Sequence, residues 1–326
     1  MENPDAITRT VRQAVGRMDA DLSIAGIEHL FTLPHSAVSR VALSDGKTVI
    51  VKQAGSGEFA DGLRREIVIN RDVLSELPEK VAPELLSASA DVEVPWLVFE
   101  DISATHESLP LGSPPAPPHI EKFVRALGKI HAQSMQIDLA EAFSNVPGGV
   151  YVTDGSERAA PLLDAFLHSF DSNRFPPRTY DLVKNIRDNI PTIVDLLAGQ
   201  SALIHGDAHF WNALYSDDAL VLDWALATVG PGEVDLCHAL AMNLPRDFSR
   251  EHEPPALRLY VQTCSEVGVD LDESDVLDRY RICLLQTVVV AVGMQAVVGM
   301  PDAVWTRLFT NAVQSAIDHE SLAYLG

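Results

Sequence analysis

Three polar side chains in one short stretch could together carry out phosphoryl transfer. Asp207, Asn212 and Asp223 lie between Ala202 and Trp224, where two apolar runs flank a polar loop. An aspartate can accept the proton of an attacking hydroxyl group, while an asparagine oxygen and a second carboxylate suit the Mg²⁺ ion that bridges nucleotide phosphates. We expect the apolar runs to close as a hairpin-like pair and to present the three side chains near one another.

The same stretch contains an alternative set of ligands. His205, Asp207, His209 and Asp223 could hold zinc or a pair of metal ions in a hydrolase, because imidazole and carboxylate groups both bind such ions. This alternative gives no role to Asn212 or to the amino-terminal third of the chain, so we favour phosphoryl transfer.

The loop also carries a family resemblance. His205-Gly206-Asp207-Ala208-His209-Phe210-Trp211-Asn212 resembles the His-Gly-Asp-x-His-x-x-Asn loop of the aminoglycoside phosphotransferase and choline kinase family, and its Asp-to-Asn spacing of five is that of kinase catalytic loops. Asp223 followed by Trp224 resembles the metal-binding segment of that family. The segment 230–236 is similar to its Gly-x-x-x-x-Asp-Leu pattern, in which the aspartate, here Asp235, braces the catalytic loop.

The resemblance implies an α+β fold with two lobes, like that of protein kinases. The small β-rich lobe would comprise residues 1–101 and bind the nucleotide. The larger, mostly helical lobe, 102–326, would hold the catalytic loop and the acceptor site. In this scheme Asp207 is the catalytic base, and Asn212 and Asp223 bind Mg²⁺.

The amino-terminal part shows the pattern expected of the β-rich lobe. A helix is predicted to end near Met18, and strands are predicted over 27–33, 37–43 and 48–52, the last two joined at an Asp-Gly turn. Lys52 ends the third strand, where the resemblance implies a lysine that neutralises nucleotide phosphates. Glu66, in a helix predicted from Leu63 to Pro78, is implied to pair with that lysine.

The rest of the predicted nucleotide site has weaker sequence signals. No glycine-rich phosphate loop of the usual form occurs, so phosphate contacts are expected near Ser36 or Ser39, in a turn over 33–39. The strand 95–102 leads to the linker between the lobes, where main-chain groups near Glu100 and Ile102 would meet the base. The cofactors implied are ATP or GTP and Mg²⁺.

The carboxyl-terminal two thirds is predicted to be mainly helical. Residues 110–118 are expected to form an extended, proline-rich loop. Helices are predicted over 120–135, 179–197, 236–242, 257–267, 274–298 and 303–322.

Composition limits the partners. The net charge of −22 argues against a nucleic-acid surface and against docking on anionic membranes. No lysine follows Lys184, and acidic residues gather near residue 275, so a cationic acceptor is plausible beside the simpler explanation of a solvated acidic surface. The sequence carries no signal for oligomeric state.

Cysteine usage and the absence of a leader predict a cytoplasmic protein. Cys237, Cys264 and Cys283 are odd in number, without metal-binding spacing, and lie in apolar helical contexts typical of reduced thiols. The chain begins without a secretion signal. Residues 282–300 approach the length of a membrane span, but polar side chains interrupt them, so we expect an interior helix.

We therefore predict a small-molecule kinase that moves the γ-phosphate of ATP or GTP to a hydroxyl group of an aminoglycoside, an amino sugar, an amino alcohol or an uncharged alcohol. The alternatives are a catalytically silent kinase-like binding protein and the metal-dependent hydrolase.

Overall fold

The computed structural model describes residues 4–19, 21–32, 36–55, 60–146, 154–199 and 201–326. The chain forms two compact units. The first comprises Met1–Ser108, Ala140–Gly149 and Ala213–Ala227, and the second comprises Leu109–Leu139, Val150–Asn212 and Thr228–Gly326. The first unit thus extends past the predicted lobe boundary at residue 101 to Ser108 and also includes two later segments; the boundary stays a prediction.

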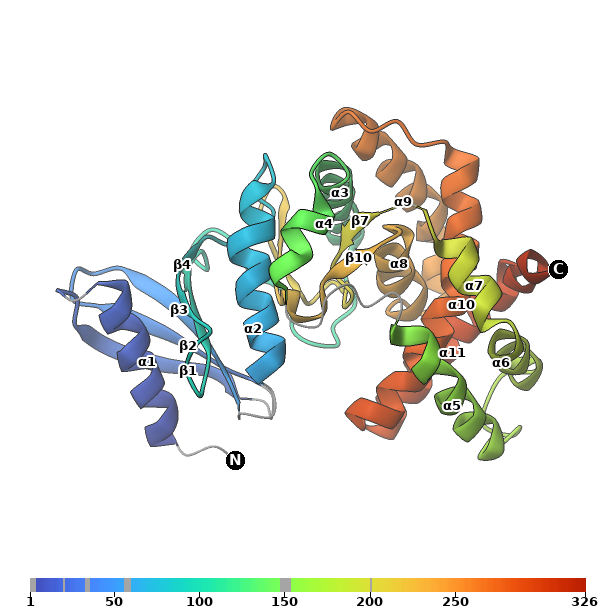
Figure 1. Ribbon diagram of the computed structural model, residues 1–326, viewed down its shortest axis with the longest axis horizontal. Coiled ribbons are helices and arrows are strands. Elements are labelled where there is room, and N and C mark those ends of the chain that lie inside the picture. The colour runs from blue at the N-terminus through green and yellow to red at the C-terminus, as the bar shows by residue number, and fades with distance from the viewer. Residues whose placement is uncertain (1–3, 20, 33–35, 56–59, 147–153, 200) are drawn as a thin grey trace. The chain divides into compact units, whose positions relative to one another are not determined.

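The first unit is built on an antiparallel five-stranded sheet in the order β1-β2-β3-β5-β4 (Figure 1). Its strands are β1 Ile24–Thr32, β2 Ser36–Leu43, β3 Thr48–Ala54, β4 Leu85–Ser89 and β5 Trp96–Glu100. The predicted hairpin is present: β2 and β3 join at Gly46, whose φ of +86° is accessible to glycine without strain. The strands predicted at the amino end are therefore confirmed.

Helix α1, Pro4–Met18, packs on this sheet through Ile7, Val11, Ala14 and Val15. These residues recur at the spacing of one helix face, so all four side chains enter the core formed with β2, β3 and β5. The predicted end of the helix at Met18 is confirmed.

Helix α2, Ala60–Val68, carries Glu66 and packs its Leu63 and Ile67 against Ala54 and Leu97 of the sheet. The helical path continues through a π turn, η2 Ile69–Val73, and a 3₁₀ turn, η3 Leu74–Glu76. The predicted helix therefore begins three residues earlier than expected and changes its pitch before Pro78.

A three-stranded sheet completes the first unit, in the order β6-β8-β9, from β6 Glu107–Ser108, β8 Ala213–Tyr215 and β9 Ala219–Val221. The apolar runs on either side of the turn at 216–218 pair with each other. The short 3₁₀ turn η5, Trp224–Leu226, follows Asp223.

The second unit is mostly helical, and its core lies around α10, which packs against α5, α7, α8 and α11 (Figure 1). The helical elements are α3 Pro117–Ser134, α5 Asp154–His168, α6 Thr179–Asp188, α7 Ile190–Leu197, α8 Glu233–Leu236, η6 Cys237–Met242, α9 Arg246–Glu266, α10 Glu273–Gly293, η7 Met294–Val298, α11 Asp302–Asp318 and η8 Ser321–Leu325. Two short turns, α4 Leu139–Ala142 and η4 Phe143–Asn145, lie where the chain returns to the first unit.

Prolines account for two differences from the predicted helices. Helix α3 starts inside the stretch predicted as a loop, because Pro117 and Pro118 occupy its first turn, where a missing N–H costs nothing. The helix predicted over 179–197 is two helices that meet at Asn189, before Pro191, which has no N–H to continue the first.

The strand before the catalytic loop was paired wrongly in the sequence prediction. β7, Ala202–Ile204, forms an antiparallel pair with β10, Thr228–Gly230, and not with the apolar run that follows the loop. Closing β8 on β9 needs only a short turn, which costs less chain entropy than closing the longer loop 205–212. No helix in the described residues has the length and hydropathy needed to cross a membrane.

Candidate active site

In the first unit, Lys52 contacts two carboxylates. Its Nζ lies 2.6 Å from Oε2 of Glu66 and 2.8 Å from Oδ1 of Asp223. Lys52 lies in β3, and Glu66 lies in α2, 14 positions further along the chain. Asp223, 171 positions from the lysine, follows β9. The side chain of Glu66 is buried, whereas that of Asp223 is 39% exposed.

These contacts and the burial of the groups shift the pKa values of Lys52 and Glu66. Burial opposes the charge on Lys52, but Glu66 and Asp223 together hold its pKa above the usual value. Burial raises the pKa of Glu66 to about 7, helped by Asp223 and opposed by Lys52. The ammonium group of Lys52 thus contacts two carboxylates, and of these two only that of Asp223 is partly exposed to solvent.

Asp223 has an unusual backbone conformation. Its φ of 65° and ψ of 65° lie in the left-handed region, which non-glycine residues seldom adopt and which aspartate tolerates better than most. Trp224 follows, buried, with its indole N–H donating to the carbonyl oxygen of Val221. The buried indole fixes the turn that presents the Asp223 carboxylate.

Arg65 joins the segments that carry these two carboxylates. Its guanidinium is buried and donates from both Nε and Nη2 to the carbonyl oxygen of Ala227. It also lies over the ring of Phe143. Since Glu66 is the next residue and Asp223 starts the turn that leads to Ala227, Arg65 couples their positions.

Glu66→Gln is expected to gain stability relative to wild type as the pH rises and to lose turnover. Because the folded-state pKa is raised, the native protein holds a proton that the unfolded chain loses between about pH 4.5 and 7, so wild-type stability falls with rising pH in that window. Glutamine removes this loss, and the stability of the variant relative to wild type should rise across the window by at most about 3 kcal/mol. Turnover should fall, because Lys52 loses one partner.

The measurement is thermal unfolding of both proteins from pH 5 to pH 8. If the stability of Glu66→Gln minus that of wild type stays constant or falls with rising pH, the assignment is contradicted. Glu28→Gln, at an exposed carboxylate on β1, serves as the control.

The other residues predicted for nucleotide binding lie in β2, at the end of β5 and just after β5. Ser36 and Ser39 are buried in β2, and the Ser39 hydroxyl is 3.0 Å from Nδ1 of His29. The Glu100 carboxylate accepts from Lys80 and from the N–H of Glu84.

The carbonyl oxygen of Ile102 accepts hydrogen bonds from the N–H groups of Thr105 and His106. The first part of the predicted turn, 33–35, lies outside the described residues. Contacts of all four residues with a nucleotide stay predictions.

In the second unit, a buried carboxylate holds the catalytic loop. Asp235 of α8 accepts from the N–H of His205 at 2.6 Å and from the N–H of Gly206 at 3.0 Å, through different oxygens. Gly206 has a φ of +81°, which suits glycine. The N–H of Asp207 is then 3.2 Å from Nδ1 of His205, so the turn before Asp207, the predicted catalytic base, is fixed at three successive amides.

A histidine and a tyrosine support that carboxylate. Burial alone would raise the pKa of Asp235, but His131, His205 and the hydrogen bonds hold it below its usual value. An ionised carboxylate only accepts, so Nε2 of His131, 3.2 Å from Oδ2, carries the proton. Nδ1 of the same ring then accepts from the hydroxyl of Tyr260 at 3.1 Å.

Gly232 leaves room for this network, and Gly232→Ala should disrupt it. An added Cβ would lie 2.4 Å from both Nδ1 of His131 and the Tyr260 hydroxyl oxygen. Overpacking of this kind typically costs about 1–3 kcal/mol, and the displaced His131 would loosen Asp235. We expect a lower midpoint of thermal unfolding together with lower turnover.

The control is Gly293→Ala in α10, where the added Cβ would meet, among the described residues, only Leu162 at 3.9 Å. If both alanine variants unfold at the wild-type temperature, Gly232 is not needed for close packing.

Asp207 is surrounded by histidines. Nε2 of His238 is 3.2 Å from its Oδ1, and Nε2 of His209 is 3.6 Å from its Oδ2. Burial alone would raise the pKa of Asp207, but His238, His209 and His205 hold it well below the usual range. The carboxylate is therefore ionised at neutral pH and able to receive a proton.

Asn212 lies against the same residue. Its Nδ2 donates to the carbonyl oxygen of Asp207 at 3.1 Å and is 3.5 Å from Oδ2 of the carboxylate. The amide oxygen of Asn212 is thereby directed away from Asp207. The structure thus brings Asp207 and Asn212 together in the second unit, and Lys52, Glu66 and Asp223 together in the first.

Two of the predicted ligands carry oxygens of a type that suits Mg²⁺. The amide oxygen of Asn212, in the second unit, and the partly exposed carboxylate of Asp223, in the first, are each hard oxygen donors of the kind that Mg²⁺ takes. Among the described residues, no group of three or more His, Cys, Asp or Glu side chains is placed to hold a metal ion.

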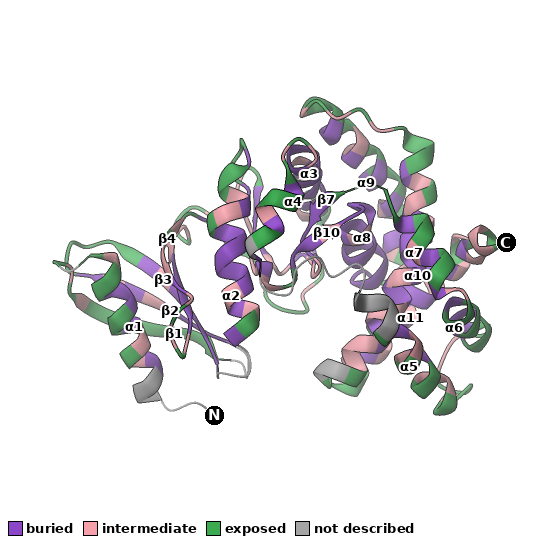
Figure 2. Ribbon diagram, viewed as in Figure 1, coloured by how far each residue is buried: buried purple, intermediate pink, exposed green. Residues whose placement is uncertain are grey.

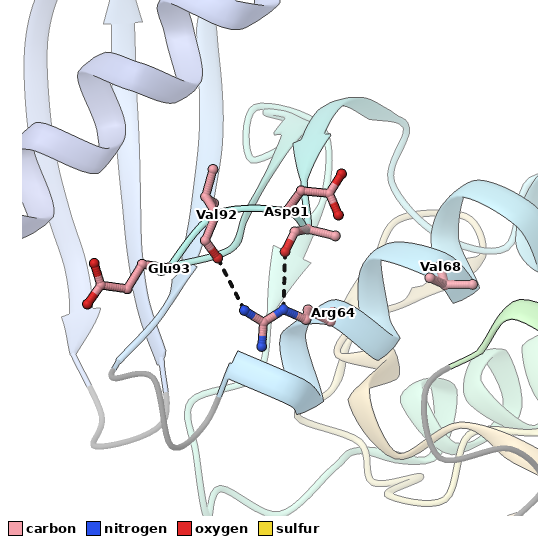
Figure 3. A pocket seen from close by; sticks show the side chains of 6 residues that line it. Arg64, Val68, Asp91, Val92 and Glu93 are labelled. Atoms are coloured by element: carbon pink, nitrogen blue, oxygen red, sulfur yellow. Dashed lines mark hydrogen bonds between the residues drawn. The ribbon is translucent and has the colours of Figure 1, made fainter.

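A pocket of about 580 Å³ in the first unit contains none of these residues (Figure 3). It lies between α2 and the turn from β4 to β5 and is lined by Arg64, Val68, Ala90, Asp91, Val92 and Glu93. The Arg64 guanidinium donates to the carbonyl oxygens of Ala90 and Val92, while the Asp91 and Glu93 carboxylates point away from it (Figure 3). The guanidinium of Arg64 thus holds the turn between β4 and β5 through these hydrogen bonds.

Sequence reasoning gave no role to Arg65, Tyr260 or His238. Arg65 and Tyr260 form hydrogen bonds with residues 162 and 129 positions away in the chain, and contacts at such separations leave no local sequence pattern. His238 did have a signal: it follows Asp235 by three positions in a helical segment, and residues at that spacing share a face.

A sequence model of the phosphotransferase enzyme family matches residues 35–265. A search of curated proteins finds no match. Macrolide 2'-phosphotransferase MphH from Brachybacterium faecium is similar in structure, with a TM-score of 0.64 and 17% identity over 93% of this chain and 98% of that one.

Two further solved structures are similar. Choline kinase LicA from Streptococcus pneumoniae has a TM-score of 0.61 and 14% identity over 98% of this chain and 99% of that one. Aminoglycoside phosphotransferase APH(4)-Ia, solved as a thermostable mutant with ADP and hygromycin B, has a TM-score of 0.59 and 13% identity over 95% and 98%. The predicted α+β, protein-kinase-like fold is confirmed.

Proposed function

Because this chain belongs to the phosphotransferase enzyme family and is a small-molecule kinase, we propose that it moves the γ-phosphate of ATP or GTP to a hydroxyl group of its acceptor. The observation that carries the choice of donor is the contact of Lys52 with both Glu66 and Asp223. A lysine oriented by one buried carboxylate beside a second, exposed one suits a phosphate chain with its Mg²⁺. The ADP bound to the similar aminoglycoside phosphotransferase supports a nucleotide donor.

In the proposed reaction, Lys52 binds phosphate oxygens and Glu66 orients Lys52. Asn212 and Asp223 would hold Mg²⁺, which supplies charge neutralisation at the phosphate oxygens when bound. Asp207 orients the acceptor hydroxyl and takes its proton as the oxygen attacks the γ-phosphorus. The low pKa of Asp207 keeps its carboxylate ionised, so it can accept the hydrogen bond that orients the acceptor hydroxyl.

The nucleotide contacts near Ser36, Ser39, Glu100 and Ile102 belong to the same proposal. So does the acceptor class: the net charge of −22 favours a cationic amino sugar, aminoglycoside or amino alcohol over an uncharged alcohol. The similar structures include macrolide and aminoglycoside phosphotransferases and a choline kinase, which supports a hydroxylated small molecule.

We further propose that the protein works in the cytoplasm and without a nucleic-acid or membrane partner. Its cysteines, all buried free thiols, suit a reducing compartment, and its acidity disfavours anionic surfaces.

Thermal unfolding with ATP or GTP, each with and without Mg²⁺, tests the donor. A ligand at a hundred times its dissociation constant adds about 2.7 kcal/mol to stability, which should raise the unfolding midpoint by several degrees. We expect a rise that needs Mg²⁺ and that identifies the preferred base. Asp223→Asn should lose the Mg²⁺-dependent part, while Asp217→Asn, an exposed change in the same unit, should keep it.

The outcomes separate the alternatives. A rise without phosphate transfer to any acceptor would favour a silent binding protein. No rise with either nucleotide, combined with a transition metal retained through purification, would favour the hydrolase.

A further inference from the structure

His238 lies in a π-helical segment that side chains hold in place. In η6 the wider turn leaves carbonyl groups that need other donors, and π turns are frequent at functional sites. Asn243 donates from Nδ2 to the carbonyl oxygen of His238 at 2.8 Å, and Asn311 of α11 donates to that of Met242 at 3.1 Å. All residues of η6 are buried, as is most of α8 before it (Figure 2).

The ring of His238 is placed against Asp207. The side chain is 7% exposed, and Nε2 lies 3.2 Å from Oδ1 of the carboxylate. Nε2 makes no aligned hydrogen bond within the described part of the chain, so this ion-pair contact is its polar contact there. A protonated Nε2 can donate to this carboxylate, which only accepts when it is ionised.

The two oxygens of Asp207 are held unequally. Oδ1 has His238 at 3.2 Å, whereas Oδ2 has longer contacts, with Nδ2 of Asn212 at 3.5 Å and Nε2 of His209 at 3.6 Å. The Asp207 side chain is 31% exposed, which leaves room for an incoming group. The shortest of these contacts is the one to Oδ1, and the two longer contacts at Oδ2 are the ones that an acceptor hydroxyl could replace.

We propose that His238 is a positioning residue that holds Oδ1 of Asp207, so that Oδ2 receives the proton of the acceptor hydroxyl. The inference rests on the proposed phosphoryl transfer. In the step, the acceptor O–H bond breaks and its proton moves to Oδ2. The acceptor oxygen bonds to the γ-phosphorus, the bond to the β–γ bridging oxygen breaks, and the nucleoside diphosphate leaves with that electron pair. His238 keeps its Nε2 proton throughout.

The test compares His238→Leu with His238→Gln in steady-state phosphoryl transfer. Leucine keeps apolar bulk and removes the donor, whereas the amide nitrogen of glutamine can reach the place of Nε2. A catalytic group misplaced by 1 Å can cost about 100-fold in rate, so we expect His238→Leu to lower kcat about 10- to 100-fold with KM for the nucleotide unchanged. His238→Gln should recover most of this loss, and His168→Leu, an exposed change at the end of α5, should match wild type.

A purely structural role would give a different result. If leucine and glutamine lower kcat equally, or if both leave it at the wild-type value while wild type transfers phosphate, the proposal fails and the proposed function stands. If wild type transfers no phosphate to any acceptor, the proposed function fails instead.

A second measurement needs no acceptor. The midpoints of thermal unfolding of wild type, Asp207→Asn, His238→Leu and the double variant form a cycle in which contacting residues give non-additive shifts. We expect non-additivity between these two positions and additive shifts when His168→Leu replaces His238→Leu. Additive shifts for Asp207 and His238 would overturn the proposal whatever the acceptor is.

Discussion

Asp207→Asn is expected to lower turnover by about 10²–10⁴-fold, because asparagine cannot take the proton of the acceptor hydroxyl. The change is isosteric, and Asn212 and the Asp235 network keep their main-chain contacts with the loop. Binding of Mg²⁺ and nucleotide should therefore stay close to wild type. The measurements are steady-state transfer for turnover and the nucleotide-induced rise in unfolding temperature for binding.

The combination of the two readouts decides the role of Asp207. Unchanged turnover would remove Asp207 from the chemistry. Lost turnover together with lost nucleotide binding would make it part of the binding site instead of the base.

Asp235→Asn is expected to have the largest effect on stability. Each oxygen of this buried carboxylate accepts from a different backbone N–H, Oδ2 from His205 and Oδ1 from Gly206. Whichever way an asparagine is turned, its NH₂ group faces one of these donors. Breaking a buried, hydrogen-bonded charge typically costs about 3–5 kcal/mol, so chemical denaturation should show a loss of that order.

Asp195→Asn, on the exposed face of α7, removes the same charge without a buried partner and should unfold like wild type. If the two asparagine variants are equally stable, Asp235 does not brace the loop. Turnover of Asp235→Asn should fall as well, because the turn that presents Asp207 loses its fixed amides.

Local signals in the sequence predicted much of the first unit. The Asp-Gly turn between alternating strands specified the β2–β3 hairpin, and the first helix ends at Met18 as predicted. Such patterns are readable because the residues that interact are near neighbours in the chain or share a periodic face.

Contacts between distant segments could not be predicted in this way. The pairing of β7 with β10 depends on which strand reaches that edge, and the sequence of Ala202–Ile204 suits several partners. Arg65 and Tyr260 are single side chains whose partners lie more than a hundred positions away. The family resemblance supplied the candidate residues of the catalytic loop, but it carried no statement about His238, which the fold places beside Asp207.

The most direct test of the central claim follows the γ-phosphate itself. The protein is incubated with Mg²⁺ and γ-labelled ATP or GTP, together with hydroxylated acceptors that range from aminoglycosides and amino alcohols to uncharged alcohols, and the label is traced. We predict that it appears in a phosphate ester of a small molecule with wild type and not with Asp207→Asn. If the nucleotide binds but the label stays on it or passes only to water across all acceptor classes, the assignment of this protein as a hydroxyl-directed kinase is contradicted.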